Sequence, residues 1–495
     1  MTAKPSGISR REFVRQVAMG GVLATASWGR PAMAELPRKK PNVLLVFPDQ
    51  MRGSAMGFLK EEPVLTPTLD RLAAQSLVLP QCASNYPVCS PYRAMLMTGR
   101  YPHANGVLEN CTSAAAAYGY ELRAADRCWS DVLKDQGYSL GYIGKWHLDA
   151  PHKPYVKSYN NKEGFAWNEW TPPARRHGFD FWYAYGTFDQ HLNPMYWSTN
   201  ASRDEAVRVN QWGPEHEADL AVRYLKNDGG RFRDPDKPFA LVVAMNPPHM
   251  PYNQVPGKYV DLYGNKTVKD LNARADAAPE STQAGWRAIG QIKNYFAMIT
   301  GVDEQFGRIL KALDETGLCD DTIVVFTSDH GNCLGCHGEI SKNVAWEESM
   351  RVPFLIRWPG RIPPRQDPLL LSTPDICPTL LDLMGFAGAI PREVQGCSHA
   401  KVFQGGDGPR PTSQLYIWVP MGDPAGGRRG VRTDRHTLVL TKAKDGSIRQ
   451  ELYDRSTDPY QLKNLASEQP DVVKRLIDTE LTPWLRKTGD PWLGA

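Results

Sequence analysis

Cys89 opens a run of residues, 89–100 (CSPYRAMLMTGR), whose residue types could form a nucleophile for an anionic substrate. Pro91 is typical of the first turn of a helix, where free backbone N–H groups and the helix dipole favour negative charge. Arg93 adds a planar cation that stays protonated. The pattern predicts a reactive thiol at a helix start, whereas a cysteine without these neighbours would be an ordinary buried residue.

Polar residues with acid, base or ligand chemistry follow four short apolar runs. The runs are residues 42–47, 140–143, 239–245 and 323–327, and they stop at Asp49-Gln50, Lys145-Trp146-His147, Asn246-Pro247-Pro248-His249 and Asp329-His330. Near-continuous apolar runs that alternate with helical patterns indicate a parallel sheet covered on both faces. Ligands bind outside the carboxyl ends of such strands, so we expect the four polar clusters to converge on one site.

The chemistry of these clusters suits a metal ion and an anionic substrate. Asp49, Gln50 and Asp329 offer oxygen atoms, which hard divalent cations such as calcium or magnesium prefer, and His330 adds a nitrogen. Lysine and histidine side chains can stabilise negative charge on a substrate and donate or accept protons. Each of these residues alone would more often be a surface or packing residue, so the hypothesis depends on their shared position at strand ends.

The run at Cys89, read as Cys-x-Pro-x-Arg followed by Thr98-Gly99, resembles the signature of the type I sulfatases. Tyr92 stands where the family usually has a small residue. The resemblance implies an alkaline-phosphatase-like fold and oxidation of Cys89 to formylglycine by a maturation enzyme. The hydrated aldehyde would attack sulfur.

The same resemblance implies roles for the residues at the strand ends. The family's metal ion, usually Ca²⁺, would be held by position 89 and four other residues: Asp49, Gln50, Asp329 and His330. Gln50 replaces a second acid, so this site carries less negative charge than the commonest version. The implied sulfate pocket comprises Arg93, Lys145, His147, His249 and Lys342. There, His249 with Lys342 would protonate the leaving oxygen, and His147 would take a proton from the second hydroxyl so that sulfate departs.

The apolar runs and helix signals predict an α/β fold with a large mixed, mostly parallel sheet covered by helices on both faces. This catalytic domain is expected over residues 35–394, with helices from Thr66-Pro67 and Thr373-Pro374. From residue 395 to 495, glycine-rich turns between short alternating segments predict a smaller α+β subdomain on an antiparallel sheet, with a final helix from Pro470. Its Glu451–Asp454 and Asn464-Leu465 also resemble the C-terminal region of sulfatases.

Residues 155–234 are interpreted as an aromatic-rich insertion over the site. Aromatic rings beside cations can stack on sugar faces and pair with acidic groups, although an aromatic mini-core explains most of these rings equally well. The expected substrate-binding residues are Arg176, His177 and His191 from this region, together with His337.

The N-terminus predicts export. Ser9-Arg10-Arg11 precedes an apolar stretch and a small-residue cleavage site at Ala32-Met33-Ala34, which is typical of a twin-arginine signal peptide over residues 1–34. We expect passage through the Tat translocase and a periplasmic or secreted protein without a stable membrane span. An uncleaved N-terminal anchor is the alternative.

Net charge and cysteine content limit the binding partners and cysteine roles that can be expected. The net charge of the 495 residues is +4, which gives no reason to expect nucleic acid. Nine cysteines is an odd number for an exported protein, so one thiol with a separate role is expected and the pairing of the rest stays open. Cys333-Leu334-Gly335-Cys336-His337 matches a haem-attachment pattern, and a redox pair or plain loop cysteines are the other interpretations.

Together these features predict an exported sulfatase acting on a sulfated small molecule or, more specifically, a carbohydrate sulfate. A phosphodiesterase or phosphonate monoester hydrolase of the same superfamily could use the same nucleophile. An anion-binding or haem-carrying protein without catalytic activity is the alternative from another class.

Overall fold

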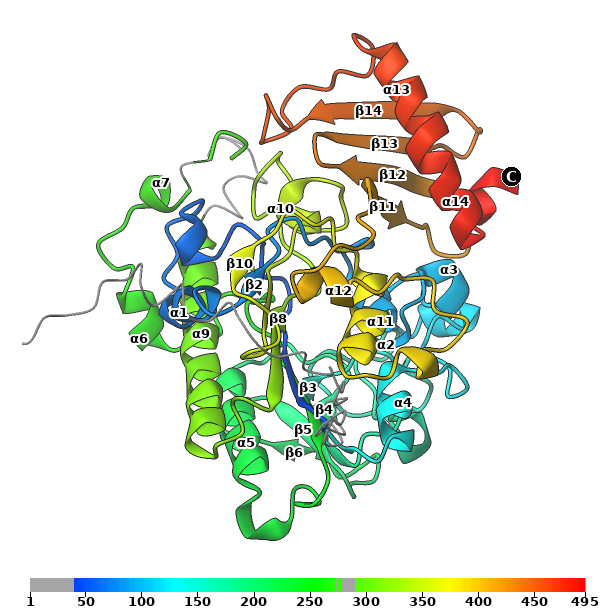
Figure 1. Cartoon of the computed structure of the whole chain (residues 1–495). Coiled ribbons are helices and arrows are strands. Elements are labelled where there is room, and N and C mark those ends of the chain that lie inside the picture. Colours follow the sequence, from blue (N-terminus) through cyan, green and yellow to red (C-terminus); the bar gives the residue numbers. More distant parts are fainter. Residues whose placement is uncertain (1–39, 273, 278–289, 495) are drawn as a thin grey trace, which may run out of the picture. The chain divides into compact units, whose positions relative to one another are not determined.

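The structure, a computed structural model, describes residues 40–272, 274–277 and 290–494. The expected signal peptide, residues 1–34, lies outside them. A ten-stranded sheet forms the centre of the chain from residue 40 onward (Figure 1). Its strands, in spatial order, are β10 (Arg365–Gln366), β2 (Leu77–Val78), β9 (Phe354–Arg357), β8 (Thr322–Thr327), β1 (Asn42–Val46), β7 (Phe239–Ala244), β3 (Ser139–Lys145), β4 (Phe181–Tyr185), β5 (Met195–Ser198) and β6 (Val207–Arg208).

The five central strands, β8-β1-β7-β3-β4, run parallel, and the strands that follow on either side include antiparallel pairs. The register places Val43 beside Ala240 of β7 and Ile323 of β8, and Leu140 of β3 beside the same Ala240. The four runs expected as strands are therefore adjacent and end at one edge of the sheet. The predicted α/β fold with a mixed, mostly parallel sheet is confirmed.

Alternation within the strands explains why helices cover both faces. In β1, Val43 and Leu45 belong to one apolar core and Leu44 and Val46 to the other, and all four are buried. The first core is completed by α2 (Cys89–Thr98), α4 (Trp129–Asp135), α11 (Thr373–Leu383) and α12 (Ala400–Phe403). The second is completed by α1 (Pro67–Ala73), α5 (Gly213–Lys226), α6 (Gly257–Asp261), α7 (Val268–Leu271) and α9 (Ile292–Glu315). Figure 1 shows the two groups on opposite sides of the sheet.

Two short helices complete the part of the chain around the sheet: α3 (Pro102–Asn105) and α10 (Glu347–Met350). Among the described residues, no helix is both long enough and apolar enough to span a bilayer.

Residues 155–234 correct the interpretation of this stretch as an insertion. β4 pairs in parallel with β3, β5 and β6 extend the same sheet, and α5 packs against α9. Trp182 and Ala184 of β4 face the apolar core that contains Trp146. The aromatic residues that suggested an excursion are mostly core residues of the sheet edge, since strand alternation and aromatic enrichment are also what a buried edge needs.

The expected C-terminal antiparallel sheet is present. It contains β11 (Ser413–Trp418), β12 (Gly427–Thr433), β13 (His436–Lys442) and β14 (Ile448–Asp454), followed by α13 (Pro470–Leu476) and α14 (Thr482–Thr488). Leu415 and Leu438 of this sheet share an apolar cluster with Leu476, Leu485 and Met95. Since Met95 belongs to α2, the second sheet also supports the helix that begins at Cys89.

Candidate active site

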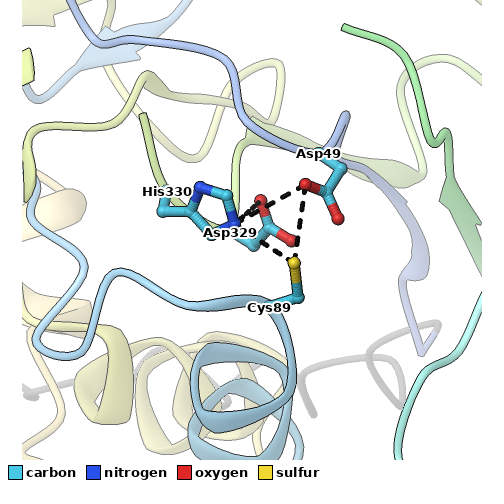
Figure 2. A group of neighbouring side chains, drawn as sticks. All are labelled: Asp49, Cys89, Asp329 and His330. Carbon is cyan, nitrogen blue, oxygen red and sulfur yellow. Dashed lines mark hydrogen bonds and ion pairs between the residues drawn. The ribbon is translucent and has the colours of Figure 1, made fainter. Parts of the chain in front are cut away.

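Cys89 lies at the start of α2, beneath the carboxyl ends of β1 and β8. Its Sγ is 3.3 Å from Nε2 of His330 and 3.8 Å from Oδ1 of Asp49. Figure 2 shows these side chains and Asp329 pointing toward one another. All four are almost completely buried. We call Asp49, Cys89, Asp329 and His330 the nucleophile cluster.

Arg93, one helical turn after Cys89, holds the two carboxylates of the cluster in place. Its guanidinium contacts Oδ2 of Asp49 at 3.1 Å and Oδ2 of Asp329 at 3.0 Å, and it donates to the carbonyl oxygen of Lys145 at 2.5 Å. The side chain is 2% exposed. A buried guanidinium with three fixed acceptors keeps its orientation, so Arg93 braces the ends of β1, β8 and β3 against α2.

Two lysines contact the sulfur from the cavity side. Nζ of Lys145 and Nζ of Lys342 each lie 3.7 Å from Sγ of Cys89, and Lys145 also pairs with Asp49 at 2.7 Å. Burial and Asp49 both favour the neutral thiol, but Lys145, Lys342 and His330 outweigh them and hold the pKa of Cys89 well below its usual value. Position 89 is therefore a place where the protein stabilises negative charge.

Gln50 has a different environment from the other expected metal ligands. Its Oε1 accepts a hydrogen bond from Nζ of Lys342 at 2.7 Å, and its Nε2 donates to the hydroxyl of Tyr252 at 2.9 Å. Its backbone N–H donates to Oδ1 of Asp329 at 3.0 Å, with φ at 71°. The structure thus places Gln50 beside the cluster, with its side-chain oxygen directed to Lys342.

The donor atoms of the nucleophile cluster fit a divalent cation. Nδ1 of His330 lies 2.9 Å from the carbonyl oxygen of Gly331 and must donate to it, so Nε2 is the nitrogen that faces the cluster, and it offers a lone pair when the ring is neutral. That nitrogen is 3.5 Å from Oδ1 of Asp49 and 3.6 Å from Oδ1 of Asp329. Burial and Asp49 raise the pKa of Asp329 to about 6 because two buried carboxylates share this space. Two carboxylates and an imidazole nitrogen around one point are ligands that a calcium-sized or smaller cation accepts.

Gly331 allows His330 to occupy this position. A side chain at residue 331 would place its Cβ 1.9 Å from the carbonyl oxygen of Glu348, which is far inside van der Waals contact. The backbone N–H of Gly331 donates to Ser349 and that of Asn332 donates to Glu348. The loop after β8 can therefore lie against α10 only with glycine at this position.

A cavity of about 430 Å³ opens above the sulfur. It is lined by residues of several separate loops: Val88, Cys89, Glu109, Asn110, Lys145, His147, Trp167, Thr187, Asp189, His249, Met250, Ser341, Lys342 and Asn343. Four of the expected catalytic residues other than Cys89 are among them: Lys145, His147, His249 and Lys342. The structure thus brings these side chains together with the nucleophile cluster around one space.

His147 is completely buried at the cavity wall and has φ at 54°, a left-handed conformation that a side chain rarely adopts. Such a conformation persists only where the surrounding structure holds it, and it is enriched at functional sites. Burial lowers the pKa of His147, and Lys145 adds to this effect while contact with Cys89 opposes it. The ring is therefore neutral at pH 7 and able to accept a proton.

The four residues expected to bind substrate do not line this cavity. Arg176 donates to the carbonyl oxygens of Thr171 and Thr199, and His177 pairs with Asp131 at 3.2 Å. His337 stacks on Trp346 with ring centroids 4.0 Å apart. His191 donates from Nε2 to the carbonyl oxygen of His249 at 2.9 Å, so it contacts the site through the backbone.

Several cavity residues were not among the expected site residues: Glu109, Asn110, Trp167, Thr187 and Asp189. Thr187 and Asp189 directly follow β4, which lies in the stretch interpreted as an insertion, whereas Glu109, Asn110 and Trp167 do not directly follow a strand. Asn246 also belongs to the site, since its Oδ1 accepts from Nζ of Lys145 at 3.2 Å. It directly follows the apolar run 239–245, so the rule that selected Lys145 and His249 would also have selected it.

All nine cysteines lie within the described part of the chain, and each is a free thiol. Cys333 and Cys336 are both completely buried. Burial raises the pKa of each thiol, to about 12 for Cys336. The surrounding protein covers this pair, and it forms no disulfide.

Comparison with known proteins agrees with this geometry. A model of the sulfatase family matches residues 41–386, and a model of the C-terminal region of N-sulphoglucosamine sulphohydrolase matches residues 335–486. An endo-4-O-sulfatase from Bacteroides thetaiotaomicron is 39% identical over 96% of this chain and 98% of its own. An ulvan-active sulfatase from Formosa agariphila is 32% identical over 91% and 82%. A solved Bacteroides fragilis structure, described as the sulfatase YidJ, has 48% identity and a TM-score of 0.88 over 93% of this chain and 98% of its own.

A buried nucleophile position at the carboxyl edge of an alkaline-phosphatase-like sheet defines the class as a hydrolase of oxyacid esters. The family model covers more than half of the chain, and the 39% identical relative matches it almost from end to end. The protein therefore belongs to the sulfatase family and is a sulfuric ester hydrolase.

Proposed function

We propose that this sulfatase hydrolyses a sulfate ester carried by a saccharide, with formylglycine made from Cys89 as the nucleophile and a divalent cation, Ca²⁺, beside it. One observation carries the proposal. The side chain at position 89 contacts Asp49, His330 and two lysines at the wall of a cavity, and a carboxylate oxygen of Asp329 lies within 4.8 Å of it. An oxygen nucleophile there would have its charge balanced before and during attack on sulfur.

Formylglycine at position 89 would supply a hydrated aldehyde, which can attack sulfur and later expel sulfate by collapse of the hydrate. The cation would be held by Asp49, Asp329 and His330, with Gln50 adjacent, and would supply positive charge that favours an ionised oxygen at position 89. An unmodified cysteine cannot perform this cycle. Sulfate bound to its sulfur would have no hydroxyl on the same carbon that could drive its release, as the hydrate has.

The remaining side chains have roles that follow from their positions. Lys145 and Lys342 lie on the cavity side of the sulfur, where the equatorial oxygens of a bound sulfate would be, and each can stabilise charge there. Neutral His147, buried against position 89, is suited to take a proton from the hydrate. His249, 13% exposed at the cavity mouth, is suited to protonate the leaving oxygen.

The cavity and the relatives support a saccharide as the alcohol part of the substrate. Beyond the lysines and histidines, the wall presents the indole of Trp167, the carboxyl groups of Glu109 and Asp189, and the amide of Asn110. Such a mixture of an aromatic face with hydrogen-bonding groups matches a sugar ring. The similar proteins from B. thetaiotaomicron and F. agariphila are named for 4-O-sulfate and for ulvan.

Export completes the proposal. The twin-arginine pattern at residues 9–14 supports passage through the Tat translocase to the periplasm or beyond. Since that route carries folded proteins and Cys89 is buried in the folded chain, the maturation enzyme must act before folding is complete.

Peptide mass spectrometry of active enzyme tests the nucleophile. Conversion of Cys89 to formylglycine lowers the mass of the tryptic peptide 72–93 by ~18 Da, whereas the tryptic peptide 101–123, with the buried Cys111, should be unchanged. Fully active enzyme with unmodified Cys89 would overturn the proposal.

Substrate class is tested on the same preparation. A panel of sulfated saccharides, 4-nitrophenyl sulfate and bis(4-nitrophenyl) phosphate should give the highest kcat/KM for one of the saccharides. Faster hydrolysis of the phosphodiester would favour the phosphodiesterase alternative.

A further inference from the structure

Asp189 has one carboxylate oxygen fixed and one directed to His249. Nδ2 of Asn160 donates to Oδ2 of Asp189 at 2.6 Å, and the backbone N–H of Asp189 donates to Oδ1 of Asn160 at 2.9 Å. The second oxygen, Oδ1, is buried and has no hydrogen-bond partner within ordinary distance. The group facing it is Nδ1 of His249, 3.5 Å away. Asn160 thus orients a carboxylate toward the ring.

Two acceptors beside the His249 ring determine that Nδ1 carries a hydrogen. Nδ1 lies 2.7 Å from the carbonyl oxygen of Met250 and 3.5 Å from Oδ1 of Asp189. Both neighbours are acceptors, so Nδ1 carries a hydrogen. Nε2 is therefore the nitrogen left to exchange a proton with a substrate.

The backbone of His249 is held by the same segment that carries Asp189. Burial lowers the pKa of His191 to about 4, so its ring is neutral and donates from Nε2 to the carbonyl oxygen of His249 at 2.9 Å. Nδ2 of Asn246 donates to the carbonyl oxygen of Phe188 at 2.9 Å. Residues 188–191 therefore hold the loop after β7 through the carbonyl oxygen of His249 and the side-chain amide of Asn246, and they face its histidine with a carboxylate.

We propose that Asp189 is a positioning residue that orients His249 through Nδ1 and stabilises the protonated ring which donates to the leaving oxygen. The inference rests on the proposed function and deepens it. As the oxygen nucleophile at position 89 forms its bond to sulfur, the S–O bond to the leaving oxygen breaks, its electron pair stays with that oxygen, and the proton moves from Nε2 to it. Asp189 stays ionised throughout and does not touch the substrate's sulfur. It acts on the reaction through His249 alone.

The electrostatics of the segment agree with this role. Burial opposes ionisation of Asp189, but His249, Lys145 and His191 outweigh it and hold its pKa below the usual value. The groups facing His249 come from several segments: Asp189 and His191 from residues 188–191, Asp49 from the end of β1, Lys145 from the end of β3, and Lys342 from the loop before α10. Of these groups, Asp189 is the carboxylate that lies within ion-pair distance of the ring.

Kinetics of matured Asp189→Asn test the proposal with two leaving groups. Because a general acid contributes roughly 10²- to 10⁴-fold, loss of its orientation should lower kcat about 10- to 100-fold on a methyl glycoside sulfate. 4-Nitrophenyl sulfate, whose leaving group needs little protonation, should change less than about threefold. The alkaline limb of the pH profile should move to lower pH, since the charged ring loses its carboxylate. Asp189→Glu should restore part of the rate.

Controls separate positioning from other roles. Asp204→Asn removes an exposed carboxylate from the same region and should leave both rates unchanged. His249→Ala with Asp189→Asn should be no slower than His249→Ala alone, because Asp189 acts through the ring. An additive loss, or a raised KM on saccharides with an unmoved pH profile, would show that Asp189 binds a sugar hydroxyl and would overturn the proposal.

A measurement without turnover distinguishes this inference from the proposed function. In histidine-labelled protein followed by NMR, Asp189→Asn should shift the titration midpoint of one ring, assigned to His249 by its absence in His249→Ala, to lower pH. An unmoved midpoint would overturn the positioning role. A shifted midpoint in an enzyme that hydrolyses no sulfate ester would keep the interaction and overturn the proposed function instead.

Discussion

Two buried clusters in this protein contain the same residue types and differ in what surrounds the sulfur. The nucleophile cluster has Cys89 with two aspartates and a histidine. A second cluster, which we call the support cluster, has Cys336 with Asp276, His337 and Glu348, and its Cys, Asp and Glu ligand atoms also lie within 4.8 Å of one another. In the first, two lysine ammonium groups contact the sulfur at 3.7 Å. In the second, the cations are arginines bound to the acids.

Arg274 shows how the support cluster differs. Its guanidinium contacts Asp276 at 3.0 Å, Glu62 at 3.5 Å and Glu348. Arg52 is bound to Glu62 at 2.7 Å and to backbone oxygens, and it reaches Sγ of Cys336 only at 3.9 Å. Burial therefore raises the pKa of Cys336 to about 12, whereas the pKa of Cys89 is well below its usual value. At Cys89 the two lysines and His330 outweigh burial, whereas at Cys336 Arg52 and Arg274 do not.

The largest expected effect separates the two sulfurs. Cys89→Ala should lower turnover on the order of 10⁶-fold, the scale of losing a covalent nucleophile. Cys336→Ala should keep turnover within about threefold and cost only the stability of a small cavity, on the order of 1 kcal/mol. Initial rates and urea unfolding of both variants measure this. Comparable losses of activity would contradict the comparison.

Bound metal should depend on the acids of the nucleophile cluster and not on those of the support cluster. Asp329→Ala should lose both bound Ca²⁺ and activity, because a charged ligand of the nucleophile cluster is removed. Asp276→Ala should keep full metal content, since Arg274 already balances that acid. Metal analysis after dialysis and reloading tests both. Full occupancy in Asp329→Ala would refute the ligand assignment.

Glu348→Ala should affect stability more than chemistry. Removing one partner of a buried ion pair costs on the order of 3 kcal/mol. Burial raises the pKa of Glu348, but His337 and Arg274 outweigh it and lower the pKa to about 2. A carboxyl with a depressed folded pKa contributes stability above its unfolded pKa and loses it as pH falls toward 2. The difference in unfolding free energy between wild type and variant should therefore shrink below about pH 4.5.

The smallest expected effect is that of Asp276, whose contribution to stability changes with pH in the opposite direction to that of Glu348. Burial and Glu348 raise the pKa of Asp276, so its contribution is fully present at low pH and is lost as pH rises through the raised pKa. Asp276→Asn cannot ionise, so its deficit in unfolding free energy relative to wild type should narrow as pH rises above about 4. The change is at most about 1.4 kcal/mol per pH unit for one group. A deficit that widens with pH would contradict this assignment.

Some features of the site could be predicted because they depend on local sequence. Buried parallel strands read as apolar runs, so the ends of β1, β3, β7 and β8 could be located before the polar residues that follow them. Pro91 marked the start of the helix at Cys89. The aromatic stretch from 155 to 234 was misread because aromatic enrichment is the same in a buried sheet edge and in a cover over a site.

The sequence by itself determined the residues of the nucleophile cluster and the edge of the sheet where they meet, since both follow from strand length and from polar residues at strand ends. The tertiary structure alone decided which partner each group faces. Asn160 turns Asp189 toward His249, Lys342 takes the side-chain oxygen of Gln50, and Arg274 neutralises the acids beside Cys336. The reason is physical: charge stabilisation falls off over a few ångströms, so it depends on distances between segments far apart in the chain.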